Sequence, residues 1–209
     1  MYIPAHFAEP CRDVLHRLIQ AHPLGMLVHQ GPAGLDANHL PFLLAPGEAG
    51  QADRLLAHVA RANPVWRELA DGAEVMVVFR GAQGYVSPSW YPGKQETHRR
   101  VPTWNYEVVH AHGRLQWRDD ERFVRGLLAR LTRQHEAGQA QPWQMGEAPP
   151  DYLAEQLRHI VGLELHLSRL EGKRKLNQHH GEADREGAIR GLEAAGQTAL
   201  ARAMREAGD

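Results

Sequence analysis

One segment of the chain combines hydroxyl groups with aromatic rings, a mixture that suits contact with a phosphate and a flat ring system. Ser87 and Ser89 alternate with prolines and lead directly into Trp90 and Tyr91. A hydroxyl donates a hydrogen bond to a phosphate oxygen, and an indole or phenol ring packs against another flat ring. Ordinary aromatic packing at a strand edge would give the same pattern, so both interpretations stay open.

A second such segment follows Pro102 and opens a long alternating run. Alternation places Thr103 and Asn105 on one face of a strand and Trp104 and Tyr106 on the other. The polar face is a candidate for the edge of a ligand, and we expect the aromatic face to pack inward. The alternative is a buried tryptophan among turn-forming neighbours.

Cations and amides mark two further candidate positions. Lys173 and Lys175 flank Arg174 at the end of an apolar run, and alternation lets both lysines face one phosphate. A solvated strand end is the alternative interpretation. Arg61 and Asn63 stand where a short strand gives way to a turn, a place where loop donors often meet ligands.

Other kinds of site find little support. No nucleophile stands beside a base, and no pair of acids suggests hydrolysis. Among 14 histidines, His110 and His112 would share one face of a strand, but no His-Glu-x-x-His motif occurs, so we predict no metal site. Cys11 is the single cysteine, which excludes a disulfide or a cysteine-based zinc site within one chain and fits a reducing compartment.

Composition bounds the class of protein. The chain has 209 residues, of which 43% are hydrophobic, so we expect one domain over residues 1–209. The 24 basic and 25 acidic residues give a formal charge of −1, and this balance does not support DNA binding, although binding through a local surface is conceivable. The start MYIPAHFAEP does not resemble a signal peptide, and no apolar run approaches the ~18 residues of a membrane span. We therefore expect a cytoplasmic protein without membrane contact.

Apolar periodicity predicts the elements that must position these candidates. The expected strands are 24–29, 35–44, 55–60, 74–80 with an irregular continuation at 85–90, 105–117 and 160–170. The expected helices are 10–21, 65–70, 119–134, 150–158 and two in the tail, about 184–207, divided at Gly196. No Gly-x-Gly-x-x-Gly fingerprint occurs. The pattern predicts an α+β protein with a six-stranded antiparallel barrel and surrounding helices.

The size of such a barrel restricts where a ligand binds. Small barrels fill their interior with side chains, so a flavin-sized molecule must lie outside, in a groove that a second subunit completes. A homodimer is therefore expected.

Six motifs, taken in order, resemble the PaiB-type family of FMN-binding negative transcriptional regulators: MYIPAHF, NHLPFLL, HVARANPVW, YVSPSWY, VPTWNYEVVHAHG and KRKLNQ. The resemblance extends over nearly the whole chain. It implies a split barrel related to pyridoxamine-phosphate oxidases and flavin reductases, a homodimer, and FMN in the intersubunit groove. It also implies cofactor contacts from Arg61, Asn63, Ser87, Ser89, Thr103, Trp104, Asn105, Lys173 and Lys175.

The closing motif departs from the family pattern, which usually reads Lys-x-Lys-Leu-Ser-Gln-Asn. Asn177 stands in place of the serine and His179 in place of the final asparagine. A hydroxyl donor is lost, although an amide can also donate. Two other functions stay open: an FMN-dependent oxidoreductase of the flavin reductase or oxidase kind, and a haem-binding split barrel with a histidine ligand.

Overall fold

Strands and helices follow one another along the protein, which a computed structural model describes over residues 1–48, 51–94 and 98–207. The strands are β1 (Ala8–Glu9), β2 (Leu24–Gly31), β3 (Gly34–Pro41), β4 (Leu43–Ala45), β5 (Arg54–Ala60), β6 (Glu74–Val86), β7 (Thr103–Arg118) and β8 (Ile160–Lys175). The helices are α1 (Arg12–Ala21), α2 (Val65–Glu68), α4 (Glu121–Glu136), α5 (Pro150–Arg158), α6 (Glu182–Ala194) and α7 (Thr198–Glu206).

The strands of the described residues form one eight-stranded sheet. Its order is β3-β2-β6-β7-β8-β5-β4, and β1 pairs with β8 outside this path. Antiparallel pairing joins β2 to β3 and β6, β5 to β4 and β8, and β1 to β8. The predicted mixture of helices with an antiparallel sheet is confirmed. The predicted number of six strands is wrong.

Two local features account for the extra strands. Pro41 has no N–H to donate and ends β3, so the predicted strand 35–44 divides and β4 pairs separately with β5. Between them, the Phe42 N–H donates to the Pro23 carbonyl at 2.8 Å. The other added strand, β1, has only two residues, which is too short for any periodicity to show.

The β6 strand is longer and more regular than predicted. It continues through Gly81 and Gly84 to Val86, and Pro88–Trp90 then forms a 3₁₀ turn instead of a strand. A Cβ at Gly84 would lie 2.0 Å from Gln197 and 3.0 Å from Leu200. Glycine at this position thus leaves room for the side chains of Gln197, the N-cap of α7, and of Leu200.

Packing divides the chain into two compact units. Unit 1 comprises Met1–His22, Phe79–His110 and Glu171–Asp209, and unit 2 comprises Pro23–Val78 and Ala111–Leu170. The strands β6, β7 and β8 contribute residues to both. The expectation of a single domain stays a prediction.

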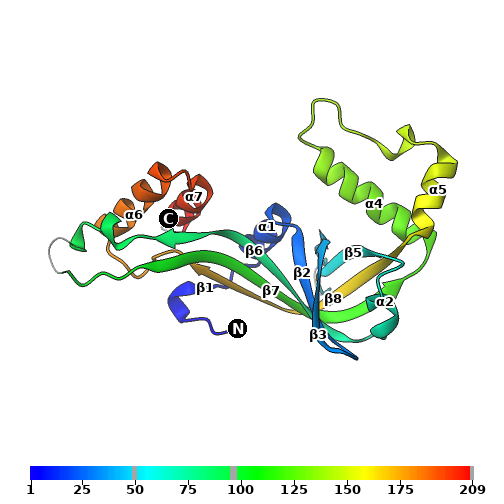
Figure 1. Ribbon diagram of the computed structural model, residues 1–209, viewed down its shortest axis with the longest axis horizontal. Coiled ribbons are helices and arrows are strands. Elements are labelled where there is room, and N and C mark those ends of the chain that lie inside the picture. Colours follow the sequence, from blue (N-terminus) through cyan, green and yellow to red (C-terminus); the bar gives the residue numbers. More distant parts are fainter. Residues whose placement is uncertain (49–50, 95–97, 208–209) are drawn as a thin grey trace. The chain divides into compact units, whose positions relative to one another are not determined.

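The core of unit 2 lies between its strands and helix α4. Val161, Leu163 and Leu165 of β8 are completely buried, as the alternation of this segment predicted. Leu127 of α4 packs in one cluster with Leu56 of β5, and α5 contacts α4 (Figure 1). Unit 2 is thus a sheet with one face closed by an amphipathic helix.

The core of unit 1 is built by the two C-terminal helices, which lie side by side (Figure 1). Ile189 and Leu192 of α6 are buried together with Leu200 and Met204 of α7. Val86, the last residue of β6, belongs to the same cluster. The tail predicted as two helices therefore supplies much of the core in this unit.

Two glycines of α6 make room for Trp90. A Cβ at Gly191 would lie 2.2 Å from the Trp90 ring, and one at Gly187 would lie 2.2 Å from the Trp90 carbonyl oxygen. The spacing of four residues puts both glycines on one side of the helix, where Gly191 makes room for the indole and Gly187 for the Trp90 backbone. The 3₁₀ turn is thereby anchored to α6.

Helix α1 also packs within unit 1, by Leu15 and Ile19. A Cβ at Gly172 would lie 2.2 Å from Leu15, so glycine in β8 allows this contact. The helix begins at Arg12, two residues after the predicted start, and Cys11 occupies its N-cap with an exposed side chain.

Candidate functional site

The ends of β7 and β8 bring together two of the predicted site residues in unit 1. The Lys175 ammonium donates to the Thr103 hydroxyl and, at 3.0 Å, to the Trp104 carbonyl. Burial lowers the pKa of Lys175, Tyr106 opposes that shift, and Lys173 adds to it. A cation held against a hydroxyl in this way is a suitable donor set for a phosphate.

Lys175 and Thr103 line a pocket of about 330 Å³, which we call the basic pocket. Its described lining residues include no acid. The lining consists of His6, Phe7, Arg99, Arg100, Val101, Pro102, Thr103, Lys175, His179 and His180. Cationic side chains and imidazoles thus surround one hydroxyl, an arrangement that attracts an anion.

Three histidines crowd one side of the basic pocket. The His179 ring centroid lies 5.4 Å from that of His6 and 4.3 Å from that of His180. Burial lowers the pKa of His179, and His180, His6 and Lys175 lower it further. For His180, burial and Arg100 lower the pKa, against the opposing effect of Asp184. A bound anion would relieve this crowding of positive charge.

A buried carboxylate holds Arg100 at the pocket. Asp184, in the first turn of α6, accepts from Arg100 Nε at 2.7 Å and from the Gly93 N–H at 2.9 Å. Burial alone would raise the pKa of Asp184, but these donors and the positive charge of Arg100 hold it below its ordinary value. Asp184 therefore holds Gly93 and Arg100 at one carboxylate.

Lys173 does not line the basic pocket. Its ammonium donates to the Tyr2 carbonyl at 3.2 Å and lies 5.3 Å from the ring centroid of Tyr106 and 5.7 Å from that of Tyr2. The two lysines thus make different contacts in the structure. A cofactor contact from Lys173 stays a prediction.

Asn105 and Asn177 turn their side chains into unit 1. Asn105 is fully buried, with its amide donating to Met204 Sδ at 3.4 Å, and the Asn177 amide donates to the Tyr91 hydroxyl at 2.9 Å. Neither Oδ1 atom has a partner among the described residues. Asn177 has a φ of 65°, a conformation that asparagine tolerates better than serine. Asparagine in place of serine at position 177 therefore fits the positive φ of this residue. His179, the second departure from the family motif, lines the basic pocket.

Trp104 differs from its expected environment. Its side chain is 52% exposed, whereas Asn105 is buried, so the expectation that the aromatic face packs inward is wrong. The reason is that α7 covers the Asn105 face of β7 through Met204. The indole thus remains accessible next to Thr103.

The serine segment lies apart from the basic pocket's lining. The Ser87 hydroxyl accepts from the Ser89 N–H at 3.2 Å and caps the 3₁₀ turn, and Lys94 Nζ lies 3.2 Å from the Ser89 hydroxyl. Trp90 packs against α6. Ser87 and Ser89 therefore have local contacts in the structure, and their role toward a cofactor stays a prediction.

Arg61 and Asn63 belong to unit 2, where they join loops. Arg61 pairs with Asp119 and donates to the Ile160 carbonyl at 3.1 Å. Asn63 donates to Asn38 at 2.7 Å and accepts from the N–H that begins α2. These contacts account for both residues structurally, and their cofactor role stays a prediction.

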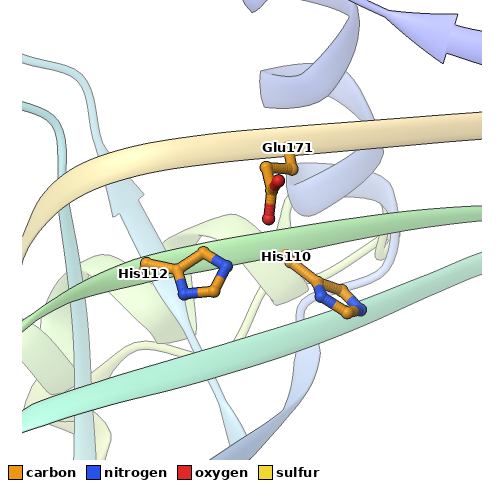
Figure 2. Close-up of side chains that lie close together, drawn as sticks. All are labelled: His110, His112 and Glu171. Atoms are coloured by element: carbon orange, nitrogen blue, oxygen red, sulfur yellow. The ribbon is translucent and has the colours of Figure 1, made fainter. Parts of the chain in front are cut away.

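The histidines of β7 are shown with Glu171 of β8 in Figure 2. His110 and Glu171 belong to unit 1 and His112 to unit 2. Within unit 1, Glu171 lies 3.5 Å from the N-terminal ammonium group.

Sequence reasoning missed most of the basic pocket. His6, Arg100 and His180 come from segments far apart in the chain, and none has a spacing that marks a site. For these residues the signal was present only in two motifs: MYIPAHF contains His6, and KRKLNQ ends directly before His179.

Solved structures share this fold. The structure of the FAD and heme binding protein from Mycobacterium smegmatis matches with a TM-score of 0.56 at 18% identity. The match covers 80% of this chain and 73% of that chain. The flavocytochrome Anf3 from Azotobacter vinelandii matches with a TM-score of 0.61 at 14% identity, over 83% of this chain and 72% of that chain. The class that this fold defines is that of split-barrel proteins.

Sequence comparison identifies the family. Residues 1–169 match the family model described as "Putative FMN-binding domain", and the chain belongs to this family, whose cofactor is FMN. Protein AN0679 of Emericella nidulans is 31% identical over 100% of this chain and 98% of its own length. The Bacillus subtilis protein named Protease synthase and sporulation protein PAI 2 is 28% identical over 88% and 85%. The PaiB-type resemblance drawn from the ordered motifs is thereby confirmed.

Among the described residues, no helix combines the length and apolar character that crossing a membrane requires.

Proposed function

We propose that the basic pocket of unit 1 binds the phosphate of FMN. The observation that carries this proposal is the convergence of Lys175, Thr103 and Arg100 with three histidines in a pocket whose lining, among the described residues, contains no acid. A phosphate monoester is close to a dianion at neutral pH and accepts several charge-assisted hydrogen bonds. Burial is the main cause of the lowered pKa values of His179, His180 and Lys175, positive neighbours lower them further, and the phosphate charge would oppose both effects.

The donor set fits the cofactor in kind. Lys175 and Arg100 supply charge, and Thr103 supplies a hydroxyl. Trp104 is half exposed and contacts Lys175 through its backbone carbonyl. When bound, FMN supplies hydride or single-electron transfer. The residues of this chain bind and orient the phosphate, and Asp184 holds Arg100 in place for that task.

The proposal includes a homodimer in which a second copy completes the groove around the cofactor. It is supported by the exposed aromatic side chains of unit 1, Tyr2, Tyr85 and Trp104. Rings of this kind are enriched at protein interfaces. The single cysteine supports action in the cytoplasm.

Regulation of transcription is proposed as an indirect consequence of flavin binding. The resemblance to a sporulation protein supports a regulatory role, whereas the formal charge of −1 does not support a DNA-binding surface. The alternative, an FMN-dependent oxidoreductase, would consume NAD(P)H in the presence of FMN. Sequence-selective binding to promoter DNA at physiological salt would instead support direct regulation.

Phosphate recognition is tested by comparing FMN with riboflavin, which lacks the phosphate. We expect FMN to bind about 10- to 100-fold more tightly, because a charged hydrogen bond contributes about 1.5–3 kcal/mol. Quenching of flavin fluorescence on titration with the protein measures both affinities. Equal affinities would show that the basic pocket does not hold the phosphate, and absence of any flavin binding would sink the proposal as a whole.

Proton uptake offers a second test. At pH 7 the FMN phosphate is mainly a dianion, whereas the lowered pKa values of His179 and His180 keep both rings neutral. A bound dianion raises these pKa values, so FMN binding should take up protons and should strengthen as the pH falls from about 8 toward about 6.5. Calorimetry in two buffers of different ionisation enthalpy measures the uptake. Riboflavin is the control, and net proton release with FMN would contradict the assignment.

A further inference from the structure

A second pocket of unit 1 lies between α1 and α7 and shares no lining residue with the basic pocket. Its volume is about 480 Å³, which is within the range of small-molecule sites. We call it the α1–α7 pocket. It is lined by Val14, Arg17, Leu18, Ala21, His22, Ala82, Glu107, Arg174, Ala199, Arg202, Ala203 and Glu206.

A buried carboxylate forms part of this pocket. The Glu107 side chain is only 4% exposed, and its Oε1 accepts from Arg174 Nε at 2.8 Å. No described residue donates to its second oxygen, Oε2. A Cβ at Gly81 would lie 3.2 Å from Oε2, so glycine at this position leaves space beside that oxygen. Oε2 is not one of the fully enclosed polar atoms that lack a partner, so it faces the open space of the pocket and can accept a hydrogen bond from a donor group of a ligand.

The guanidinium of Arg174 is already engaged. Besides Glu107, it lies 3.5 Å from the Glu9 carboxylate and 3.5 Å from the Ala203 carbonyl oxygen, and its side chain is 11% exposed. Two carboxylates therefore share this one cation. Only Glu107 of these two carboxylates lines the pocket, and because Arg174 is shared with Glu9, the charge of Glu107 is not fully balanced and favours a cationic group beside it.

The rim of the pocket has the opposite character. Arg17 is exposed, and Arg202, with a side chain 78% exposed, has only a long contact of 3.9 Å with Glu206. Apolar groups such as Val14 and Leu18 of α1 and Ala203 of α7 form the walls between the rim and Glu107. A purely cationic ligand would meet two arginines at the entrance, whereas a ligand with a carboxylate at its outer end would pair with them.

From this arrangement we infer that the α1–α7 pocket binds a small amino carboxylate. Its ammonium group donates to Glu107 Oε2, its carbon atoms pack between α1 and α7, and its carboxylate lies at the rim near Arg17 and Arg202. The assignment is independent of FMN, since none of these residues contributes to the basic pocket.

Calorimetric titration of the full chain with four probes tests the charge requirement. 6-Aminohexanoate and its isomer L-norleucine carry both charges, hexylamine lacks the carboxylate, and hexanoate lacks the ammonium group. We expect 6-aminohexanoate, whose two charges lie at opposite ends, to bind saturably and about 10-fold more tightly than either singly charged probe. L-Norleucine carries both charges on one carbon and should bind more weakly than its isomer. No binding of 6-aminohexanoate, or binding of any other probe as tight as its own, would overturn the inference.

Two variants locate the site. Glu107→Gln keeps an acceptor for Arg174 but replaces Oε2 by an amide donor, so affinity for the zwitterion should fall at least about 10-fold. Ala199→Leu narrows the pocket and leaves the Glu107–Arg174 pair intact, and it should also weaken binding. Ala194→Leu, the same change at an exposed position of α6 outside the pocket, is the matched control. Unchanged affinity in Ala199→Leu, or an equal loss in Ala194→Leu, would exclude this pocket even if Glu107→Gln fails to fold.

Discussion

Replacing Lys175 by alanine is expected to weaken FMN binding about 10- to 100-fold and to leave riboflavin binding nearly unchanged. The lysine is the cation that contacts the Thr103 hydroxyl at the ends of β7 and β8, and a charged hydrogen bond contributes about 1.5–3 kcal/mol. Burial, together with Lys173, already lowers the pKa of Lys175, so a phosphate would restore a counter-charge to a partly desolvated ammonium. Fluorescence titration with both flavins measures the effect.

Lys173→Ala is the matched comparison because it removes the same side chain two residues earlier on β8. Lys173 contacts Tyr2 and Tyr106 and does not line the basic pocket, so we expect a smaller loss of FMN affinity. A larger loss in Lys173→Ala than in Lys175→Ala would place the phosphate elsewhere in unit 1. An equal loss of FMN and riboflavin affinity in Lys175→Ala would indicate a structural role instead of phosphate recognition.

Replacing Asp184 by alanine is expected to lower the free energy of unfolding by about 3 kcal/mol, as is typical when one partner of a buried charged pair is removed. The carboxylate is 5% exposed and accepts hydrogen bonds from Arg100 and the Gly93 N–H. Its loss leaves both donors without this acceptor at the base of the basic pocket. Urea denaturation followed by tryptophan fluorescence measures the change.

The matched control lies on the same helix. Glu186 forms an exposed pair with Arg190, at 4.0 Å, and Glu186→Ala should change stability by no more than about 0.5 kcal/mol. An equal loss of stability in both alanine variants would show that the buried Asp184 contacts stabilise the fold no more than an exposed ion pair does.

The contribution of Asp184 should also depend on pH. Its pKa is lowered in the folded protein, so its stabilising effect is complete above the ordinary value of about 3.9 and is lost as the pH falls through the lowered value. The stability difference between the unchanged protein and Asp184→Asn should therefore shrink in strong acid. If the stability difference between the two proteins grew between pH 5 and pH 3, the pKa of Asp184 would be raised in the folded protein and not lowered.

Much of the framework could be predicted from the sequence because periodicity reports burial directly. The alternation of residues 160–170 identified the core side of β8, and Gly196 correctly divided the two C-terminal helices. The break at Pro41 and the continuity of β6 through Gly81 and Gly84 were not predictable in the same way. They depend on which partner strand or helix approaches the backbone, and single-sequence patterns carry no such information.

The candidate site was predictable only in part. Thr103 and Lys175 were named from their types and from strand alternation, and the structure places them in contact. Arg100 and the three histidines were missed, because their approach is set by the Asp184 network and by the turn at Asn177. The environment of Trp104 was misjudged since α7, far away in sequence, covers the opposite face of β7.

The single cysteine gives the molecule one natural attachment point for a reporter group. Cys11 is exposed at the N-cap of α1, the helix whose Val14 and Leu18 line the α1–α7 pocket. A maleimide dye would label this one thiol without prior mutagenesis. Because bound FMN absorbs in the blue, energy transfer between cofactor and dye would report occupancy of the flavin site. In the same sample, the fluorescence intensity of the dye would report binding in the α1–α7 pocket.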